Sequence, residues 1–253
     1  MILFRSLLFN LLFYINLTVL LLVAIPSIVM PRWAPLAMAR VWGRTTLWLL
    51  RVVCGIGVEW RGLDKIPPGG VLIAAKHQST WETFALVTVL ADPAFIIKRE
   101  LMLIPFFGWC AWRAGMIPVD RSAGKAALDN MTAHARAAVA QGRQIVIFPE
   151  GTRRGAGAPP RYKIGVAHLY VTCGVPCVPI ALNSGLFWPR RRLIRYPGTV
   201  RVEVLDAIPP GRNRDDFFAG LERDLEAATA RLIEEGAREL GLGPLADRPQ
   251  AQR

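Results

Sequence analysis

Short apolar runs alternate with amphipathic stretches along the chain from residue 56 onward. Runs rich in Val and Ile that are bounded by Gly, Pro or polar residues predict β-strands. The predicted strands cover residues 70–75, 94–98, 144–149, 175–182 and 199–206. Apolar residues at helical spacing predict helices over residues 79–90, 124–141, 162–172 and 215–240. Within the strands the apolar residues are continuous rather than alternating, which favours a sheet covered by helices on both faces.

Strands that alternate with helices predict one α/β domain over residues 56–245, with a largely parallel or mixed sheet. The last predicted helix has an apolar face that we expect to pack on the sheet. This face carries Phe218, Leu221, Leu225, Ala228 and Leu232. Residues 246–253 are polar and follow the last predicted element, so we expect a frayed tail.

Residues 1–55 are more apolar than the rest of the chain and predict N-terminal helices that attach the protein to a membrane. Residues 6–31 contain no charged side chain and are dominated by Leu, Ile, Val and Phe. The stretch exceeds the roughly 20 residues that cross a hydrocarbon core and the roughly 7–15 apolar residues of a cleaved signal. Asn10, Asn16 and Pro26 interrupt it. Two arrangements therefore stay open: a helix that spans the membrane, and one that bends or lies partly in the interface.

A basic stripe follows the apolar stretch. At about 100° per residue, Arg40, Arg44 and Arg51 fall on one side of a helix. The opposite side carries Trp42, Leu49 and Val53. Such a helix suits either a membrane surface or docking on the domain, and the first interpretation gives a two-helix membrane segment. Basic residues are few before the apolar stretch and many after it, so a spanning first helix would place the rest of the chain in the cytoplasm.

Composition supports contact with a membrane or with anionic ligands. Apolar residues make up 53% of the chain and the formal net charge is +12. This basic excess favours nucleic acid, an anionic bilayer or phosphorylated ligands as partners. Nucleic acid is disfavoured because the chain has neither zinc-finger spacing nor an RNP-type aromatic strand. The cysteines lie in apolar sequence and predict reduced core residues: Cys54, Cys110, Cys173 and Cys177.

His77 stands before a polar turn in the stretch AAKHQSTWETF, residues 74–84. Glu82 follows five residues later, which on a regular helix would turn the two side chains away from each other. They meet if a helix begins between them, and Ser79 with Glu82 has the S-x-x-E spacing of a capping box. Glu82 therefore either only caps the helix or also contacts His77. The other histidines lie in helical sequence and are interpreted as structural: His134 and His168.

Three further stretches carry candidate functional residues near the ends of predicted strands. KRELMLIPFFGW (98–109) and FPEGTR (148–153) lie at or after the ends of predicted strands, and VPIALNSG (178–185) runs from a strand into a turn. Ligands of open α/β sheets bind outside the carboxyl ends of the strands. Gly and Pro are also common in ordinary strand-to-helix turns, so each stretch alone fits a structural turn. The run RRRLIR (190–195) fits either lipid head groups or a solvated loop.

Taken together in order and spacing, these stretches resemble the glycerolipid acyltransferase family. That family carries an H-x4-D motif, a K-x-E-L-like block, an F-P-E-G-T-R block and a V-P-I block. This chain has HQSTWE, KREL with IPFFGW, FPEGTR and VPIA within residues 56–210. It departs at Glu82, where the commonest family residue is aspartate, and the extra methylene keeps the charge but changes the reach. The resemblance implies a fold of the glycerol-3-phosphate acyltransferase type.

Within that family the chain is most similar to the bacterial enzymes that act on 1-acylglycerol 3-phosphate. The resemblance implies acyl transfer from acyl-CoA or acyl carrier protein to the sn-2 hydroxyl of this lysolipid, without a cofactor, giving phosphatidic acid for phospholipid biosynthesis. It also implies an inner-membrane location with the active site on the cytoplasmic side, against an anionic lipid surface. Two alternatives stay open: another acceptor, such as glycerol 3-phosphate or lyso-ornithine lipid, and a non-catalytic lipid-binding protein.

The residues favour the same chemistry. Imidazole titrates near neutral pH and suits removal of the hydroxyl proton, and a carboxylate on its far nitrogen would orient it. The chain has no G-x-S-x-G elbow and no cysteine beside the histidine motif, so direct attack by the substrate hydroxyl is favoured over an acyl-enzyme. No H-E-x-x-H sequence or acidic cluster suggests a metal.

The predicted site has catalytic and substrate-binding residues. They are His77 as base and Glu82 as its orienting partner, with Lys98, Glu150, Gly151, Thr152, Arg153 and Lys163 binding substrate. By resemblance, Arg153 would hold the acceptor phosphate, which suits a planar guanidinium. Gly151 and Thr152 would let the backbone approach the ligand. Glu150 would either position Arg153, which then acts as a brace, or touch the glycerol hydroxyl.

Overall fold

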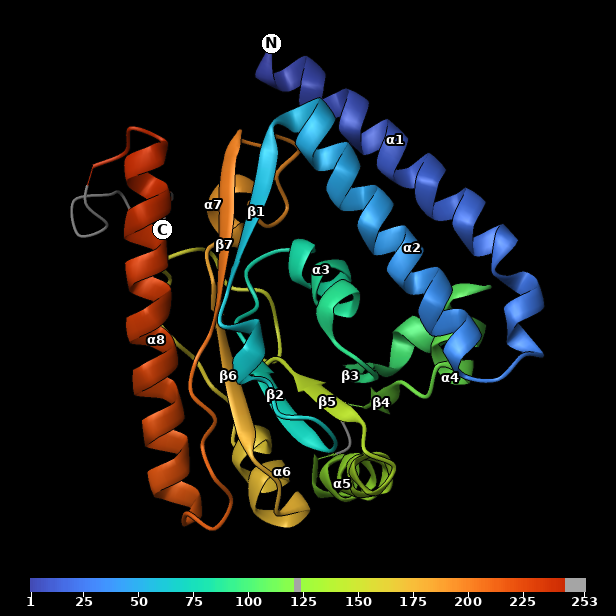
Figure 1. Cartoon of the computed structure of the whole chain (residues 1–253), viewed down its shortest axis with the longest axis vertical. Coiled ribbons are helices and arrows are strands. Elements are labelled where there is room, and N and C mark those ends of the chain that lie inside the picture. The colour runs from blue at the N-terminus through green and yellow to red at the C-terminus, as the bar shows by residue number, and fades with distance from the viewer. Residues whose placement is uncertain (121–123, 244–253) are drawn as a thin grey trace.

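A mixed β-sheet forms the centre of the molecule (Figure 1). The computed structural model describes residues 1–120 and 124–243. Within these residues the sheet has seven strands in the order β1-β7-β6-β2-β5-β3-β4. The strands are β1 (Ile56–Arg61), β2 (Val71–Ala75), β3 (Pro93–Lys98), β4 (Ile117–Val119), β5 (Gln144–Ile147), β6 (Cys177–Leu182) and β7 (Gly198–Val204). All neighbours pair in parallel except β6 and β7, which confirms the predicted largely parallel or mixed sheet.

Helices cover both faces of the sheet (Figure 1). The helices are α1 (Ile2–Val23), α2 (Trp33–Leu49), α3 (Trp81–Val89), α4 (Phe107–Arg113), α5 (Gly124–Ala140), α6 (Gly165–Cys173), α7 (Ser184–Phe187) and α8 (Arg214–Glu239). One core lies between the sheet and α5, α6 and α8. The other lies between the sheet and α3, with α1, α2 and α7 at its edge.

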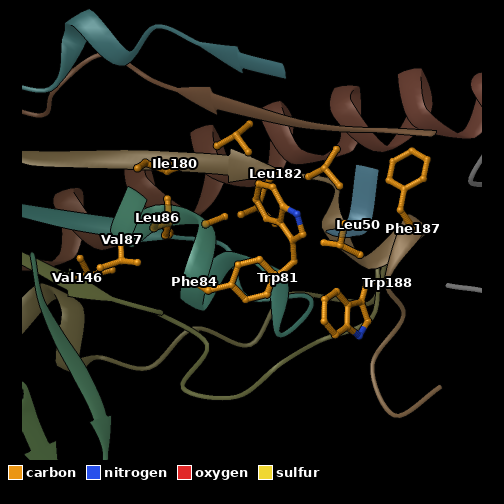
Figure 2. Packing of buried hydrophobic residues seen from close by; sticks show 14 of the residues in the cluster. Leu50, Trp81, Phe84, Leu86, Val87, Val146, Ile180, Leu182, Phe187 and Trp188 are labelled. Atoms are coloured by element: carbon orange, nitrogen blue, oxygen red, sulfur yellow. The ribbon is translucent and has the colours of Figure 1, made fainter. Parts of the chain in front are cut away.

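The continuous apolar strands follow from these two cores. Leu72 and Ala74 of β2 belong to the core under α5, α6 and α8, whereas Val71 and Ile73 belong to the core under α3. Every residue of β2 is buried, because successive side chains of a strand point to opposite faces and both faces are covered. Figure 2 shows the core on the α3 side.

The N-terminal helices complete this second core. Phe9 and Phe13 of α1 are buried, and the ring of Phe9 lies 5.3 Å from that of Trp188 in an edge-to-face arrangement. A Cβ atom at Gly43 of α2 would lie 2.6 Å from the carbonyl oxygen of Phe84, so the close crossing of α2 and α3 requires glycine. Truncating the N-terminal helices would therefore open the core of the domain.

α1 is long and apolar enough to cross a membrane, which indicates membrane association. Only 17% of its most apolar window is buried inside the molecule. The polar residues that interrupt the apolar stretch make internal contacts: Asn10 donates to the carbonyl oxygen of Leu193 at 3.3 Å, and Asn16 donates to the Thr45 hydroxyl at 3.0 Å. α1 ends at Val23, just before a short 3-10 turn, Ile25–Ile28, that contains Pro26. These polar contacts hold one side of α1 against α2 and the domain.

α2 is docked on the domain, which is the second of the two interpretations given for the helix with the basic stripe. The guanidinium of Arg40 donates to the backbone carbonyls of Leu90 and Ala91, while Arg44 and Arg51 are exposed. The residues opposite the basic stripe are partly buried against the core: Trp42, Leu49 and Val53. In the described residues α1 alone has the character of a membrane-spanning helix, so a two-helix membrane segment is not confirmed.

Most predicted boundaries agree with the structure to within a few residues. β1 and β4 were not predicted: β1 carries Glu59 and Arg61 at the sheet edge, and β4 is only three residues long and contains Pro118. On α8 four of the predicted packing residues are buried, but Phe217 rather than Phe218 is fully buried at its start. The described cysteines are all free, and two of them are only half-buried: Cys110 and Cys173. The predicted tail, 246–253, lies outside the described residues.

Candidate active site

The predicted motifs meet at one edge of the sheet. β2, β5 and β6 are neighbouring strands that run in the same direction, so their carboxyl ends lie side by side. His77 follows β2, the segment 148–153 follows β5, and Ser184 follows β6. The topology therefore assembles the site from loops far apart in the sequence.

His77 and Glu82 are in direct contact. The Nδ1 atom of His77 lies 2.9 Å from Oε1 of Glu82, across the loop that precedes α3. The Glu82 side chain is completely buried and the His77 side chain is 13% exposed. An ionised carboxylate only accepts hydrogen bonds, so the Nδ1–H group of His77 points at Glu82 and Nε2 lies on the other side of the ring. In the neutral tautomer with its proton on Nδ1, Nε2 carries the lone pair that can take up a proton.

Glu82 also organises the start of α3. Its Oε1 atom accepts hydrogen bonds from the backbone N–H groups of Gln78 at 2.6 Å and Ser79 at 2.7 Å. Its Oε2 atom accepts one from the hydroxyl of Ser184 at 2.8 Å. The bond to Ser79 N–H is half of the predicted capping box, while the Ser79 hydroxyl accepts from Trp81 N–H rather than from Glu82 N–H. Capping and contact with His77 thus occur together.

The FPEGTR segment fixes the imidazole from the other side. The rings of His77 and Phe148 stack at 4.0 Å between centroids and 16° between planes. The backbone N–H of Arg154 donates to the carbonyl oxygen of His77 at 2.8 Å. Ring stacking, the Glu82 contact and this backbone bond together restrict the rotation of the imidazole.

Arg153 lies beside the same loop. Its Nη1 atom donates to the hydroxyl of Thr80 at 2.6 Å, and the Arg190 side chain donates to its carbonyl oxygen at 2.8 Å. Arg153 makes no ion pair with Glu150 in the described residues, so the predicted brace through Glu150 is not seen. A guanidinium held by a hydroxyl keeps donors available for an anion.

Arg153 and His77 line an apolar cavity of about 360 Å³. α1 and α2 form part of its wall, together with residues of α3, β3 and α4 and the loops that carry His77 and Arg153. The lining includes Leu17, Leu20, Leu21, Met38, Trp42, Thr83, Val87, Phe95, Ile97, Phe107, Cys110, Ala111 and Phe148. The base and a cation thus share one cavity with many apolar side chains, which suits a ligand with a hydrocarbon chain and a phosphate.

Glu150 faces away from this cavity into a buried polar cluster. Its Oε1 atom lies 3.1 Å from Nζ of Lys76, which is closer to Glu226 of α8, at 2.6 Å. The Tyr162 hydroxyl donates to Glu226 at 2.8 Å. Burial raises the pKa of Glu150 although Lys76 and Arg154 oppose the shift. Because neither carboxylate oxygen of Glu150 forms a well-aligned hydrogen bond with a described residue, Lys76 compensates for this burial only in part.

The remaining predicted residues lie around the cavity without lining it. Lys98 is exposed and pairs with Glu100 at 2.7 Å. Gly151 has a φ of +65° in a tight turn, where a Cβ atom would lie 3.3 Å from the aliphatic chain of Lys163. Thr152 is exposed on the same turn. The geometry therefore places Gly151, Thr152 and Lys163 in one loop with Arg153, and Lys98 at the end of β3.

Several residues of the site were not predicted from the sequence. Ser184 holds Glu82, Thr80 holds Arg153, and the Gln78 side chain accepts a hydrogen bond from Gly185 N–H at 3.0 Å. Ser184, Thr80 and Gln78 all lie inside or next to the sequence motifs, and this position is the signal that could have identified them. Lys76, which is 4% exposed, was detectable only as a charge directly after an apolar strand. No cluster of three or more potential metal ligands occurs in the residues described here.

Comparisons with known proteins identify the family of the chain. Residues 57–183 match the family described as Acyltransferase. The chain is 38% identical over 194 residues to the 1-acyl-sn-glycerol-3-phosphate acyltransferase of Pseudomonas aeruginosa, covering 77% of this chain and 76% of that protein. It is 33% identical over 184 residues to the human 1-acyl-sn-glycerol-3-phosphate acyltransferase alpha, covering 71% of this chain and 65% of the relative.

A solved structure shares the fold. The 1-acyl-sn-glycerophosphate acyltransferase of Thermotoga maritima superposes with a TM-score of 0.70 at 24% identity, over 91% of this chain and all of that one. The family match and the two relatives define an acyltransferase enzyme. The chain belongs to the acyltransferase family, which confirms the resemblance found in its motifs.

Proposed function

We propose that the protein transfers an acyl group from an acyl thioester to the sn-2 hydroxyl of 1-acylglycerol 3-phosphate, giving phosphatidic acid. The observation that carries this proposal is the shared cavity: His77, oriented by Glu82, and Arg153 both line a space that is otherwise apolar. A lysolipid with one phosphate and one acyl chain has matching chemistry. The names of the relatives from P. aeruginosa and human support the same acceptor.

The proposed reaction follows from the orientation of the His77 ring, whose Nδ1 atom contacts Glu82. Its Nε2 atom accepts the proton of the sn-2 hydroxyl as the oxygen attacks the thioester carbonyl. The C–S bond then breaks, the thiolate leaves, and the proton on Nε2 is available to it. Glu82, held by two backbone N–H groups and Ser184, stabilises the imidazolium that forms between these steps. No covalent enzyme intermediate and no cofactor beyond the thioester donor is required.

The proposed substrate-binding residues have different roles that depend on where they lie in the site. Arg153 pairs with the acceptor phosphate, and the Gly151 turn with Thr152 lets the backbone approach it. Lys163, whose side chain lies over that turn, and Lys98, at the end of β3, supply further positive charge. The acyl chain occupies the apolar cavity, so α1 and α2 form part of the substrate site as well as the attachment. Glu150 faces away from the cavity, and its ion pair with Lys76 holds the FPEGTR segment in place.

We infer that the enzyme works at the inner (cytoplasmic) membrane with its site on the cytoplasmic side. The outward face of α1 and the excess of basic residues after it support this arrangement. Residues 1–55 form the attaching unit and residues 56–245 the acyltransferase domain, a division supported by the start of β1 at Ile56. The donor is acyl-CoA or acyl carrier protein, and an anionic lipid surface is the membrane partner.

The test is acyl transfer by purified enzyme to labelled 1-acylglycerol 3-phosphate. Wild type should form phosphatidic acid, and His77→Ala should lower kcat by about 10²–10⁴-fold, the usual size of general-base catalysis. His134→Ala is the matched control, because His134 is exposed on α5 and its ring forms a hydrogen bond with the Asn130 carbonyl of its own helix. Activity of His77→Ala within threefold of wild type would exclude the mechanism. Glycerol 3-phosphate and lyso-ornithine lipid, offered as acceptors, test the choice of substrate.

A further inference from the structure

Arginine side chains gather around the loop that holds His77. They are Arg153, Arg154, Arg190 and Arg191. Arg154 is tied to His77 through its backbone N–H, and Arg190 to Arg153 through the hydrogen bond to its carbonyl oxygen. Partial burial, followed by repulsion from Arg191, Arg153 and Arg154, lowers the pKa of Arg190. The four guanidinium groups are therefore close enough to act on one another.

These charges lack carboxylate partners in the described part of the chain. Several arginines elsewhere in the protein are paired: Arg61 lies 2.9 Å from Glu235, and Arg201 lies 2.8 Å from Glu239. None of the four arginines around His77 forms an ion pair with a described residue, and the Nε atom of Arg154 is buried without a hydrogen-bond partner. Glu150 interacts electrostatically with Arg154, but its ion pair is with Lys76. A group of unpaired cations indicates an anionic ligand.

One phosphate does not account for this group. A phosphate monoester carries about two negative charges at most, and Arg153 already supplies a guanidinium to the acceptor phosphate in the proposed function. Arg154, Arg190 and Arg191 remain. Arg190 and Arg191 come from the segment after α7, and Arg190 contacts the backbone of Arg153, whereas Thr80 contacts its side chain.

The second anionic reactant is the acyl donor. Whether the donor is acyl-CoA or acyl carrier protein, its acyl group is attached to a pantetheine arm that ends in a phosphate. Because the arm is long, its phosphate must lie well away from the thioester carbon, whereas the acceptor phosphate lies close to the reacting hydroxyl. An anion site that begins at Arg153 and continues through Arg190 to the exposed Arg191 meets both requirements.

We propose that Arg154, Arg190 and Arg191 form a donor subsite that binds the phosphate at the end of the pantetheine arm. The proposal rests on the proposed function, because it assumes a thioester donor. It assigns a separate cation to each substrate: Arg153 to the acceptor, and the other arginines to the donor. Binding of the phosphate there would align the thioester with the cavity in which His77 lies.

The experiment compares two donors that carry the same acyl group, acyl-CoA and an acyl thioester of N-acetylcysteamine, which has no phosphate. The variant is Arg190→Gln combined with Arg191→Gln, and Arg191→Gln alone leaves the hydrogen bond from Arg190 to Arg153 in place. We expect the KM for acyl-CoA to rise by about 10-fold or more in the double variant, as for loss of a hydrogen bond between charged groups. The rate with the phosphate-free donor and the KM for the lysolipid should stay within twofold. Arg223→Gln, an exposed arginine on α8, is the control for net charge.

Other outcomes overturn the proposal. A rise in the KM for 1-acylglycerol 3-phosphate with an unchanged donor KM would assign the arginines to the acceptor. Weaker binding to vesicles of phosphatidylglycerol with an unchanged donor KM would assign them to lipid head groups. Binding of coenzyme A to the wild-type and variant proteins, measured by calorimetry, is independent of turnover. Equal affinity in this measurement contradicts the subsite, whereas absence of lysolipid acylation by wild type contradicts the proposed function instead.

Discussion

The hydroxyl of Ser184 donates a hydrogen bond of 2.8 Å to Oε2 of Glu82, and both side chains are completely buried. Ser184 begins α7 directly after β6, whereas Glu82 lies on α3 after β2. The contact joins two motifs that are 102 residues apart. Because Oε1 of Glu82 is occupied by His77 and by backbone N–H groups, Ser184 is the group that fixes the rotation of the carboxylate.

Ser184→Ala should therefore lower kcat through Glu82. Loss of a hydrogen bond to a charged group costs about 1.5 kcal/mol or more, so we expect roughly a 10-fold decrease in kcat with little change in the KM for the lysolipid. A double-mutant cycle with Glu82→Gln separates this role from general stability. In the Glu82→Gln background, Ser184→Ala should have much less effect on kcat. Equal effects in both backgrounds would show that Ser184 acts on the fold alone.

Glu82→Gln tests whether orienting His77 matters beyond capping α3. The amide oxygen can still accept from the backbone N–H groups of Gln78 and Ser79, so the free energy of unfolding should fall by only about 1 kcal/mol. The charge that stabilises the imidazolium is lost, so kcat should fall by about 10²–10⁴-fold. Thermal melts and turnover measured on one preparation decide between the roles. Glu82→Asp, which keeps the charge, should retain more activity than Glu82→Gln.

The sequence contained the motifs but not the contacts between them. Continuous apolar runs predicted the central strands because both faces of the sheet are covered, whereas the edge strand β1, with alternating polar residues, gave no such signal. The spacing of His77 and Glu82 allowed their contact because a helix begins between them. Ser184 could not be assigned to Glu82, because this requires knowing that β6 lies beside β2. Strand order depends on the packing of the whole domain, which no local pattern contains.

Arg153→Ala tests the anchor for the acceptor phosphate. A phosphate pair contributes in both the ground state and the transition state, so the KM for 1-acylglycerol 3-phosphate should rise by roughly 10–150-fold with a smaller change in kcat. Arg153→Lys should restore only part of the affinity, because a point charge does not replace a planar fork. The rate on monoacylglycerol, which has no phosphate, should barely change.

Thr80→Val is the control for Arg153, because it removes the hydroxyl that accepts from Nη1 but keeps the guanidinium. Its effect on the KM for the lysolipid should be small. If Arg153→Ala lowers the rates on 1-acylglycerol 3-phosphate and monoacylglycerol by the same factor, Arg153 supports the loop and does not bind phosphate.

Glu150→Gln should change how stability depends on pH. Burial raises the pKa of Glu150 above its ordinary value of 4.5. A group with a raised pKa contributes stability that is fully present below the pKa of the unfolded chain and is lost as the pH rises through the folded value. The Tm of Glu150→Gln relative to wild type should therefore increase as the pH rises above 4.5.

Glu100→Gln is the comparison for Glu150. Glu100 is exposed, and its hydrogen bond with Lys98 lowers its pKa, so its contribution to stability has the opposite dependence on pH. Its glutamine variant should not gain in relative Tm as the pH rises. A difference between Glu150→Gln and wild type that is constant with pH would show that the buried carboxylate does not titrate in this range.

The outward face of α1 provides the test of attachment. Removing residues 1–54 would also remove Phe9, Phe13 and Leu50 from the core, so loss of membrane binding by such a truncation would not separate attachment from unfolding. Charges on the exposed face avoid this problem. Leu11 is 59% exposed and Ile15 49% exposed, on the side of α1 away from the core. Each aspartate placed in a bilayer costs about 2.5–3.5 kcal/mol.

Leu11→Asp combined with Ile15→Asp should move the enzyme from the membrane fraction to the supernatant while its Tm in detergent stays near that of wild type. Val171→Asp is the matched control, because Val171 is 53% exposed on α6, on the face of the sheet opposite α1. It introduces one of the same charged residues at a similar exposure and should leave the distribution unchanged. If the α1 variant remains in the membrane fraction, α1 does not carry the attachment. Trp48 and Trp112, two of the exposed aromatic residues of α2 and α4, would then be the positions to test.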